Sequence, residues 1–321
     1  MTAFPPGVAW PTKQTVEALT AAGVAPAGVV AIIRAALTED GVLDADGRIL
    51  PDPTTWATIP ADHVSTLVLR ARRSGVVAGV PCAAAAFEML GASAAGPGQP
   101  MVVRIIRADG AAVQPTDAIL TVTGNTRTLL LAERTALNLL SHLSGIATLT
   151  AQWVAAVAGT GAVIRDTRKT TPGLRVLEKY AVRCGGGHNH RMTLCDAALI
   201  KDNHVAAAGG VTEAIRAVRI AHPMLPCEVE VDTLAQLDEA LAAGAAEILL
   251  DNFDLPGLTH AVARVAGRAR LEASGGLTLS DAAAVAATGV DFLAVGALTH
   301  SAPVLDIGGD LIAVDGGPDP D

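Results

Sequence analysis

The sequence predicts an α/β protein in which a small amino-terminal α+β domain precedes a parallel α/β barrel. Two observations carry this prediction. From about residue 161 onward, six short apolar runs alternate with helical stretches, and such repetition is typical of a parallel sheet. Each run also ends in polar residues or glycine, and α/β barrels carry their active sites at that end of their strands.

The residues before about position 134 show a mixed pattern. Apolar spacing predicts helices over residues 15–22, 26–37, 57–73 and 82–90. Strand-type runs at residues 101–106 and 118–122 have turn residues beside them. This mixture predicts an α+β domain over residues 1–133, with the tail 301–321 as a candidate addition to it.

A further helix is predicted over residues 128–143, with Gly145 as its stop. Between Arg134 and Arg165 the only titratable side chain is that of His142, and this stretch is long enough to span a bilayer. Polar side chains and two glycines interrupt it, so we expect two helices of a soluble core and no membrane partner.

The strand-type runs of the second part cover residues 162–165, 197–200, 228–231, 247–250, 271–273 and 292–295. The helices between them have recognisable N-caps at Thr212, Thr233 and Ser280, and Gly244 and Gly289 follow two of them. These units predict a barrel domain over residues 134–300. An open doubly wound sheet is the alternative.

The residues that follow the strands favour the barrel. The successive strand ends are Asp166–Lys169, Lys201–His204, Glu230–Asp232, Asp251-Asn252, Ser274–Gly276 and Gly296. A barrel brings all such ends to one mouth, whereas an open sheet brings together only those at its switch point. Polar or glycine residues at every strand end fit a shared mouth.

Residues 166–204 concentrate basic side chains in an acidic chain. Three of the four lysines lie there, although the net charge is −9. The other cationic or titratable groups are Arg168, Arg175, Arg183, Arg191, His188, His190 and His204. Guanidinium and ammonium groups bind carboxylate and phosphate oxygens, so the cluster indicates a site for a small polyanion. A solvated basic loop is the alternative, and the apolar residues between the cations argue against it.

The composition excludes other classes of function. A pI of about 5.3 and only 2% aromatic residues argue against a nucleic-acid partner. The four cysteines lack the spacing of zinc ligands or of a disulfide framework, so we expect reduced thiols and a cytoplasmic location. The first residues lack the basic and apolar regions of a signal peptide.

The predicted mouth carries groups of both signs. Its cationic groups are Arg168, Lys169, Arg191 and Lys201, with the imidazole of His190, and its carboxylates are Glu230, Asp251 and, as a further candidate, Asp232. Glycines at Ser274-Gly275-Gly276 and at Gly296 suit a phosphate held by backbone N–H groups. The carboxylates suit ribose hydroxyls or a Mg²⁺-linked phosphate, although strand-end solvation would also explain Glu230 and Asp232. Neither GxGxxG nor a Walker A loop is present.

Seven segments in order resemble one known family. They are ERTALNLLSHLSGIAT (133–148), DTRKTTPGLRVLEKYAVRCGGGHNHR (166–191), LIKDNH (199–204), EVEVDTLAQLDEAL (228–241), LLDNF (249–253), EASGG (272–276) and VGALTHSAP (295–303). The sequence resembles quinolinate phosphoribosyltransferase, also called nicotinate-nucleotide pyrophosphorylase (carboxylating). This implies an open α/β barrel, a homodimer, and a reaction of quinolinate with phosphoribosyl pyrophosphate and Mg²⁺. The products would be nicotinate mononucleotide, pyrophosphate and CO₂, in NAD biosynthesis.

The resemblance also implies roles for individual residues. The catalytic residues would be Lys169, Lys201, Glu230 and Asp251, with Glu230 and Asp251 binding Mg²⁺ directly or through water. The substrate-binding set would be Arg134, Thr167, Arg168, Lys169, His190, Arg191, Lys201, Glu230, Asp251, Asn252, Ser274, Gly275, Gly296 and His300. Within it, Arg134 would reach quinolinate from the neighbouring subunit, and Ser274, Gly275 and Gly296 would hold the 5′-phosphate. The family pattern has glycine where this chain has Thr193, which leaves the local backbone path open.

Two other functions are compatible with the residues. Lys201 at a barrel strand end could form a Schiff base in an aldolase-type lyase. A non-catalytic accessory protein could use the same scaffold, as in the related family found beside molybdate transport genes. The KDNH segment and the carboxylates of EVEVD and LLDN favour the phosphoribosyltransferase.

Overall fold

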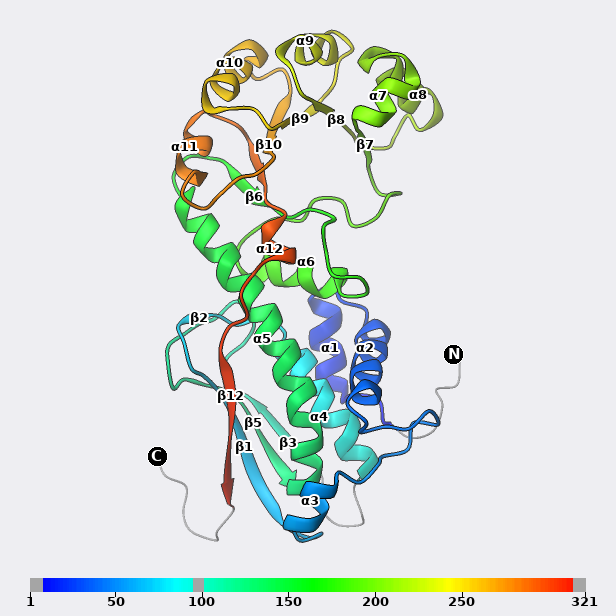
Figure 1. Ribbon diagram of the computed structural model, residues 1–321, viewed down its shortest axis with the longest axis vertical. Coiled ribbons are helices and arrows are strands. Elements are labelled where there is room, and N and C mark those ends of the chain that lie inside the picture. Colours follow the sequence, from blue (N-terminus) through cyan, green and yellow to red (C-terminus); the bar gives the residue numbers. More distant parts are fainter. Residues whose placement is uncertain (1–7, 95–100, 314–321) are drawn as a thin grey trace. The chain divides into compact units, whose positions relative to one another are not determined.

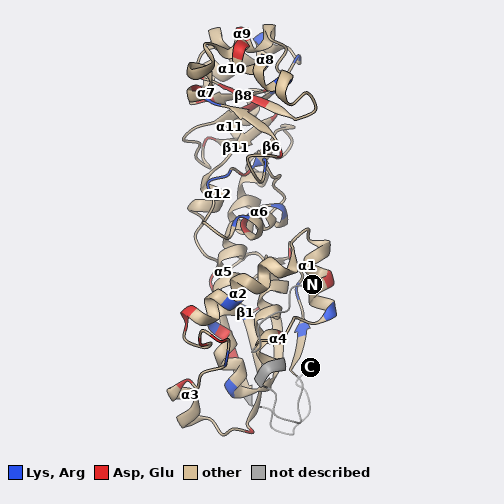
Figure 2. Ribbon diagram, turned by 90° about the vertical axis from the view of Figure 1, so that its right-hand side faces the viewer, with Lys and Arg blue, Asp and Glu red and all other residues tan. Residues whose placement is uncertain are grey.

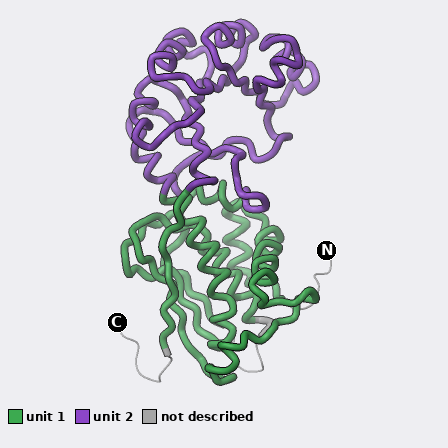
Figure 3. Tube along the Cα trace, in the orientation of Figure 1, with its two compact units in different colours: residues 1–148, 176–184, 302–321 green, residues 149–175, 185–301 purple. Residues whose placement is uncertain are grey.

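The computed structural model describes residues 8–94 and 101–313. The chain forms two compact units (Figures 1 and 3). Unit 1 comprises residues 1–148, 176–184 and 302–321, and unit 2 comprises residues 149–175 and 185–301. Each unit therefore contains segments that are distant in the sequence.

Unit 1 is built on a four-stranded antiparallel sheet in the order β12-β1-β5-β3. Its strands are β1 (Val64–Ala71), β3 (Val102–Ile105), β5 (Ala118–Asn125) and β12 (Ile307–Ala313), and a separate pair joins β2 (Gly75–Val76) to β4 (Ala112–Val113). The helices are α1 (Lys13–Ala21), α2 (Pro26–Glu39), α3 (Pro53–Thr58), α4 (Val80–Ala94), the first part of α5 (Thr126–Ala156) and nearly all of α6 (Arg175–Cys184). The tail of the chain thus supplies an edge strand to the amino-terminal sheet.

The helix predicted over residues 57–73 is wrong. The short helix α3 ends at Thr58, and Val64–Ala71 form β1 instead. This strand pairs with β5 on one side and with β12 on the other. Its β-branched residues fit a pleated sheet, and the pairing partners lie far away in the sequence, so apolar spacing alone could not reveal them.

Gly145 does not end a helix, contrary to the prediction. α5 is a single helix of 31 residues that runs through Gly145, whereas two helices were predicted. A Cβ atom at Gly145 would lie 2.2 Å from the carbonyl oxygen of Pro303 and 2.9 Å from Val304 Cα. Glycine is therefore needed here because a neighbouring backbone approaches closely, not because the helix must stop.

Unit 2 is an open parallel α/β barrel, as predicted (Figure 1). Six strands pair in parallel in the order β6-β11-β10-β9-β8-β7. They are β6 (Val163–Arg165), β7 (Ala198–Ile200), β8 (Cys227–Val231), β9 (Glu247–Asp251), β10 (Arg270–Ser274) and β11 (Phe292–Ala294). The trace of this unit curves into a ring (Figure 3), and β6 and β7 are the two ends of the sheet.

The helices of unit 2 follow the strands. They are α7 (Asp202–Ala208), α8 (Val211–Ala221), α9 (Leu234–Ala242), α10 (Leu255–Val265), α11 (Ala282–Ala287) and α12 (Ala297–His300). Thr233 caps α9 as predicted, and its hydroxyl accepts from the N–H of Gln236 at 3.2 Å. The other two predicted caps are wrong by one or two residues, because α8 begins after Gly210 and α11 after Asp281.

Within the described residues, no single helix is both long enough and apolar enough to cross a membrane. Only α1 and α2 taken together pass that test, and the two helices are bent by 113° at their junction.

Candidate active site

A cavity of about 350 Å³ opens in unit 2 where the parallel strands end. Nine predicted site residues line it together: Thr167, Arg168, Lys169, His190, Arg191, Lys201, Glu230, Asp251 and Ser274. Leu199, Leu249 and Ala294 supply its apolar wall, and Glu272 also reaches it. The carboxyl ends of all six strands thus contribute to one cavity, as a barrel mouth requires.

The cationic side of the cavity contains two guanidinium groups that lack a carboxylate partner at their Nε atoms. Among the described residues, Arg168 Nε and Arg191 Nε are buried without a hydrogen-bond acceptor. Burial and the charge of Arg168 together lower the pKa of Arg191 below its usual range. Two like charges held close together, with buried donors unsatisfied, form a site prepared for an anion that carries more than one carboxylate.

The loop after Arg191 is held by Asp196. The carboxylate of Asp196 accepts from the backbone N–H groups of Met192 (2.6 Å) and Thr193 (2.7 Å) and from the Thr193 hydroxyl (2.5 Å). These bonds, the hydroxyl bond first, hold the pKa of Asp196 well below its usual range. Arg191 also donates to the carbonyl of Ala197 at 2.8 Å. Thr193, at the position where the family pattern has glycine, is therefore part of the bonding that shapes this loop.

The acidic side of the cavity begins with an ion pair. Lys201 Nζ lies 2.5 Å from Glu230 Oε2. Lys201 immediately precedes α7 and Glu230 is the penultimate residue of β8, so the two charges neutralise each other across two adjacent strands. The Lys201 side chain is 47% exposed and that of Glu230 is 11% exposed. The ammonium can therefore exchange its partner for a ligand without crossing a buried region.

Asp251 ends β9, and Asn252 follows it in a bend. Asn252 has a φ of 55°, and its amide donates to Asp251 Oδ2 at 2.7 Å. Gly275 approaches this bend so closely that a Cβ atom would lie 2.2 Å from Asn252 Oδ1, and its own φ is +96°. Only glycine combines this conformation with this clearance. The predicted residues Asn252 and Gly275 thus contact each other and directly follow Asp251 and Ser274, which line the cavity.

Lys169 lies against the end of β11. A Cβ atom at Gly296 would lie 3.1 Å from Lys169 Cδ and 3.1 Å from His300 Nε2. The hydroxyl of Thr299 donates to the carbonyl of Lys169 at 2.7 Å. Gly296, His300 and Lys169 are therefore neighbours. Arg134, the remaining predicted residue, is exposed on the part of α5 that belongs to unit 1.

Two groups of side chains offer donor atoms that could hold a metal ion. Glu230 and Asp251 line the cavity as carboxylates at strand ends, and Mg²⁺ binds through one or two carboxylates together with substrate phosphates. Donor atoms of His190, Glu228 and Glu272 lie within 4.8 Å of one another. Glu272, however, already accepts from Arg165 at 2.7 Å, and His190 is bonded to Glu228. The donor set at Glu230 and Asp251 fits Mg²⁺. In the buried set, Glu272 Oε2 is bonded to Arg165 and Glu228 Oε2 to His190, whereas Glu228 Oε1 and Glu272 Oε1 have no hydrogen-bond partner among the described residues.

Five residues that support the site were not assigned to it from the sequence: Arg165, Asp166, Asn189, Glu228 and Glu272. Acidic residues occupy alternate positions on β8, and a basic residue ends β6 (Figure 2). Strand residues two apart share a face, so Glu228 could have been recognised from Glu230, and Glu272 from Ser274. Asp166 and Asn189 carried no comparable signal, because the two residues are 23 positions apart and bond each other only in the folded chain.

Comparison with known proteins identifies relatives over most of the chain. Residues 52–144 match the family model described as quinolinate phosphoribosyl transferase, N-terminal domain, and residues 146–310 match the C-terminal domain of the same family. The chain is 56% identical to the nicotinate-nucleotide pyrophosphorylase [carboxylating] of Mycobacterium leprae, over 84% of this chain and 94% of the relative.

Two further comparisons agree with this one. A probable nicotinate-nucleotide pyrophosphorylase [carboxylating] of Synechocystis is 43% identical over 75% of this chain and 81% of its own length. The crystal structure of NadC from Streptococcus pyogenes superposes with a TM-score of 0.82 at 38% identity, covering 91% of this chain and 99% of that one. The relatedness therefore extends over both units.

Proposed function

The chain belongs to the quinolinate phosphoribosyl transferase family, and we propose that the cavity of unit 2 joins quinolinate to phosphoribosyl pyrophosphate. The products are nicotinate mononucleotide, pyrophosphate and CO₂, which makes the chain a decarboxylating pentosyltransferase of NAD biosynthesis. This activity, predicted from the sequence, is confirmed at the level of the family.

The observation that carries the assignment of quinolinate to this cavity is the pair of guanidinium groups. Arg168 and Arg191 hold buried Nε donors without acceptors, and the two carboxylates of quinolinate would supply them. A monocarboxylate would satisfy one cation and leave the other buried and unpaired, which is costly. The pair thus favours a dicarboxylate over nicotinate. Lys201 would add a third cation by leaving Glu230 for the substrate.

The opposite side of the cavity suits the phosphoribosyl group. Glu230 and Asp251 would accept from the ribose hydroxyls, and Ser274 with the backbone at Gly275 and Gly296 would hold the 5′-phosphate. Positive charge develops on the sugar as the C1–O bond to pyrophosphate breaks, and the two carboxylates stabilise it. Lys169, which neighbours Gly296, would lie between the two substrates and stabilise the leaving pyrophosphate.

The bond changes need no covalent intermediate with the protein. The C1–O bond of the ribose breaks and its electron pair leaves with pyrophosphate, while the pyridine nitrogen of quinolinate forms the new bond to C1. The bond from the ring to the carboxylate beside that nitrogen then breaks, CO₂ leaves, and the ring carbon takes up a proton. By fixing both substrates in one cavity, the cations and carboxylates lower the entropy cost of the first step.

We also propose that Mg²⁺ takes part, held by Glu230 and Asp251 directly or through water. When bound, it would supply positive charge to the pyrophosphate oxygens. Removing divalent cations with a chelator should abolish CO₂ release and the thermal stabilisation by phosphoribosyl pyrophosphate, and adding Mg²⁺ should restore both. Full activity in the presence of the chelator would contradict this proposal.

A homodimer is proposed with Arg134 contributed across its interface. Support comes from the exposure of Arg134 on α5 and from the need for further cations at a dicarboxylate site. Mixing an Arg134→Ala chain with a second inactive chain, such as Arg168→Ala, should restore part of the activity if the site is shared between subunits. The absence of any restoration in a mixed dimer would contradict a shared site. A cytoplasmic location is proposed from the unpatterned cysteines.

The alternative functions have less support. A Schiff-base mechanism needs Lys201 Nζ free to attack a carbonyl carbon, but Nζ is paired with Glu230 Oε2 at 2.5 Å. A non-catalytic accessory role does not explain why the carboxylates of Glu230 and Asp251 line the same cavity as the cations.

Thermal-shift measurements with quinolinate, nicotinate and nicotinamide, each with and without phosphoribosyl pyrophosphate, test the substrate assignment together with a CO₂-release assay. Quinolinate alone should stabilise the protein strongly and release CO₂ when phosphoribosyl pyrophosphate is added. The variants Arg168→Ala and Arg191→Ala should lose the stabilisation by quinolinate. Equal stabilisation by nicotinate would overturn the assignment.

A further inference from the structure

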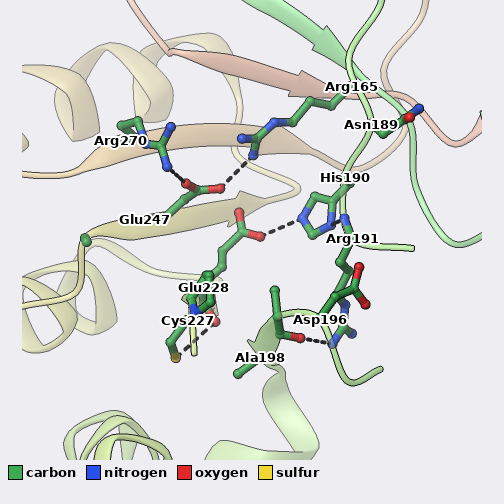
Figure 4. Close-up of a pocket in the computed structure, with 13 residues that line it drawn as sticks. Arg165, Asn189, His190, Arg191, Asp196, Ala198, Cys227, Glu228, Glu247 and Arg270 are labelled. Carbon is green, nitrogen blue, oxygen red and sulfur yellow. Dashed lines mark hydrogen bonds and ion pairs between the residues drawn. The ribbon is translucent and has the colours of Figure 1, made fainter. Parts of the chain in front are cut away.

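The imidazole of His190 is bonded within the protein at both of its nitrogens (Figure 4). The backbone N–H of Arg191 donates to His190 Nδ1 at 2.7 Å, and His190 Nε2 lies 2.7 Å from Glu228 Oε2. A ring nitrogen that accepts an N–H carries no proton of its own, so Nε2 bears the proton and donates it to Glu228. The ring is therefore oriented by Glu228 and not placed to offer a nitrogen to a ligand.

The segment that carries His190 is tied to β6 through its backbone. The N–H of His188 donates to the carbonyl of Ile164 at 2.8 Å, and the N–H of Asp166 donates to the carbonyl of His188 at 3.1 Å. The buried carboxylate of Asp166 accepts from the N–H of His190 at 2.9 Å and from the amide of Asn189 at 2.5 Å. These bonds fix the position of residues 188–190 relative to the end of β6.

Glu228 ties the same segment to a different part of the barrel. β8, which carries Glu228, is separated from β6 in the sheet by β11, β10 and β9. The bond between His190 and Glu228 therefore spans the interior of the barrel. Figure 4 shows the imidazole directed at Glu228 and Arg191 continuing from it. A change at Glu228 would release the segment on this side and leave its attachment to β6 intact.

The second carboxylate, Glu272, is held in place beside this bond. Its side chain is fully buried, with Oε1 3.7 Å from His190 Nε2 and Oε2 accepting from Arg165 at 2.7 Å. Arg165 also binds Glu247 at 2.6 Å and lies over the ring of Phe292. Burying two carboxylates is costly, and burial together with the charge of Glu228 raises the pKa of Glu272 to about 7. Stability alone does not account for this arrangement, because apolar residues would cost less.

We propose that Glu228, supported by Glu272, is a positioning residue for the dicarboxylate site, because its bond to His190 sets the path of the segment that ends in the Arg191 guanidinium. This inference rests on the proposed function of the cavity. His190 and Arg191 are consecutive, and the N–H of Arg191 is itself the donor to the His190 ring. The orientation of the ring and the backbone of Arg191 are thereby coupled.

The test compares Glu228→Ala with Glu228→Gln in the full-length chain. The glutamine amide oxygen can still accept from His190 Nε2, whereas alanine cannot. Glu228→Ala should raise KM for quinolinate roughly tenfold, the effect of one hydrogen bond, and should leave KM for phosphoribosyl pyrophosphate within about twofold. Glu228→Gln should recover most of the affinity for quinolinate.

A matched control exists in unit 1. Glu178 is a fully buried carboxylate bonded to the histidine His142 at 2.9 Å. Glu178→Gln should change the melting temperature without changing either KM. An equal rise of both KM values in Glu228→Ala, or a Glu228→Gln variant as impaired as Glu228→Ala, would show a merely structural role and overturn the proposal.

Nitrogen NMR of the His190 ring gives a second readout that does not depend on the alanine variant folding. The wild type and Glu228→Gln should both show a proton on Nε2 and none on Nδ1. A ring protonated at Nδ1 in the wild type would overturn the proposal. A wild type that folds but releases no CO₂ from quinolinate would instead refute the proposed function. An active wild type with an unchanged KM in Glu228→Ala would refute only the positioning role.

Discussion

Lys201 Nζ and Glu230 Oε2 lie 2.5 Å apart at the ends of two adjacent strands, so each group is neutralised by the other. Each would have to release its partner when the substrates bind, Lys201 to a quinolinate carboxylate and Glu230 to the ribose hydroxyls. The two binding events are thereby linked through one ion pair.

Replacing Lys201 with alanine should raise KM for quinolinate about 10–100-fold, the value of one charge-assisted hydrogen bond. Steady-state kinetics with each substrate varied in turn measure the effect. Glu230 would also lose its partner, so KM for phosphoribosyl pyrophosphate should change much less or fall. Unchanged kinetics in the alanine variant would remove Lys201 from the binding site.

Replacing Glu272 with glutamine should change how stability depends on pH. Burial, with the charge of Glu228 added, raises the pKa of Glu272 from 4.5 to about 7, so the folded chain binds this proton more tightly than the unfolded chain. The stability that the proton contributes is complete below pH 4.5 and is lost as the pH rises through about 7. Glutamine does not titrate.

Urea unfolding between pH 5 and pH 8 measures this difference. The free energy of unfolding of Glu272→Gln relative to the wild type should rise across that interval, by up to about 3 kcal/mol. A difference that stays constant with pH would show that Glu272 does not hold a proton in the folded chain.

Gly145 and Gly28 provide a matched pair of helix glycines. A Cβ atom at Gly145 would meet the Pro303 carbonyl at 2.2 Å, whereas nothing lies within 4 Å of one at Gly28. Gly145→Ala should destabilise the protein by about 1–3 kcal/mol or more because backbone must shift. Gly28→Ala in α2 should stabilise it by about 0.5–1 kcal/mol. Denaturant unfolding checks both, and similar effects of the two substitutions would disprove the close approach.

Thr193 should matter through its hydroxyl. Thr193→Val keeps the β-branched shape but loses the bond to Asp196, which spans 2.5 Å. The loop after Arg191 should loosen, and KM for quinolinate should rise roughly three- to tenfold, about 1 kcal/mol. Thr193→Ser, measured in the same assay, should retain the wild-type value. A valine variant with wild-type affinity would make this hydroxyl dispensable.

The parallel strands of unit 2 were predictable because each is an apolar run bounded by polar residues or glycine. The position of the cavity was predictable because the carboxyl ends of these strands meet there. β1 was not predictable, because its sequence also fits a helix. Its pairing with β5 and β12 selects the strand instead of the helix. Gly145 was misread for a similar reason, because the backbone of Pro303 that excludes a side chain is remote in the sequence. Local propensity describes elements, whereas long-range partners choose between them.

The charged site residues were predictable by type and position, but their internal bonding was not. Nothing in the sequence indicated that His190 would turn to Glu228, or that Asp196 would bind the backbone at Thr193. Such bonds depend on side-chain directions that exist only after the strands have paired. The sequence therefore indicated which residues gather at the mouth, and the fold determines which of them contact each other.

The pairing of β12 with β1 has a consequence for the order in which the chain can fold during synthesis. Residues 307–313 are synthesised after all of unit 2, yet they form an edge of the sheet whose other strands come from residues 64–125. While the ribosome is still translating unit 2, β1 is exposed along the edge that β12 later covers, and uncovered strand edges invite pairing with other chains. A chain truncated at residue 301 should consequently aggregate during expression, even though it retains every residue of the barrel.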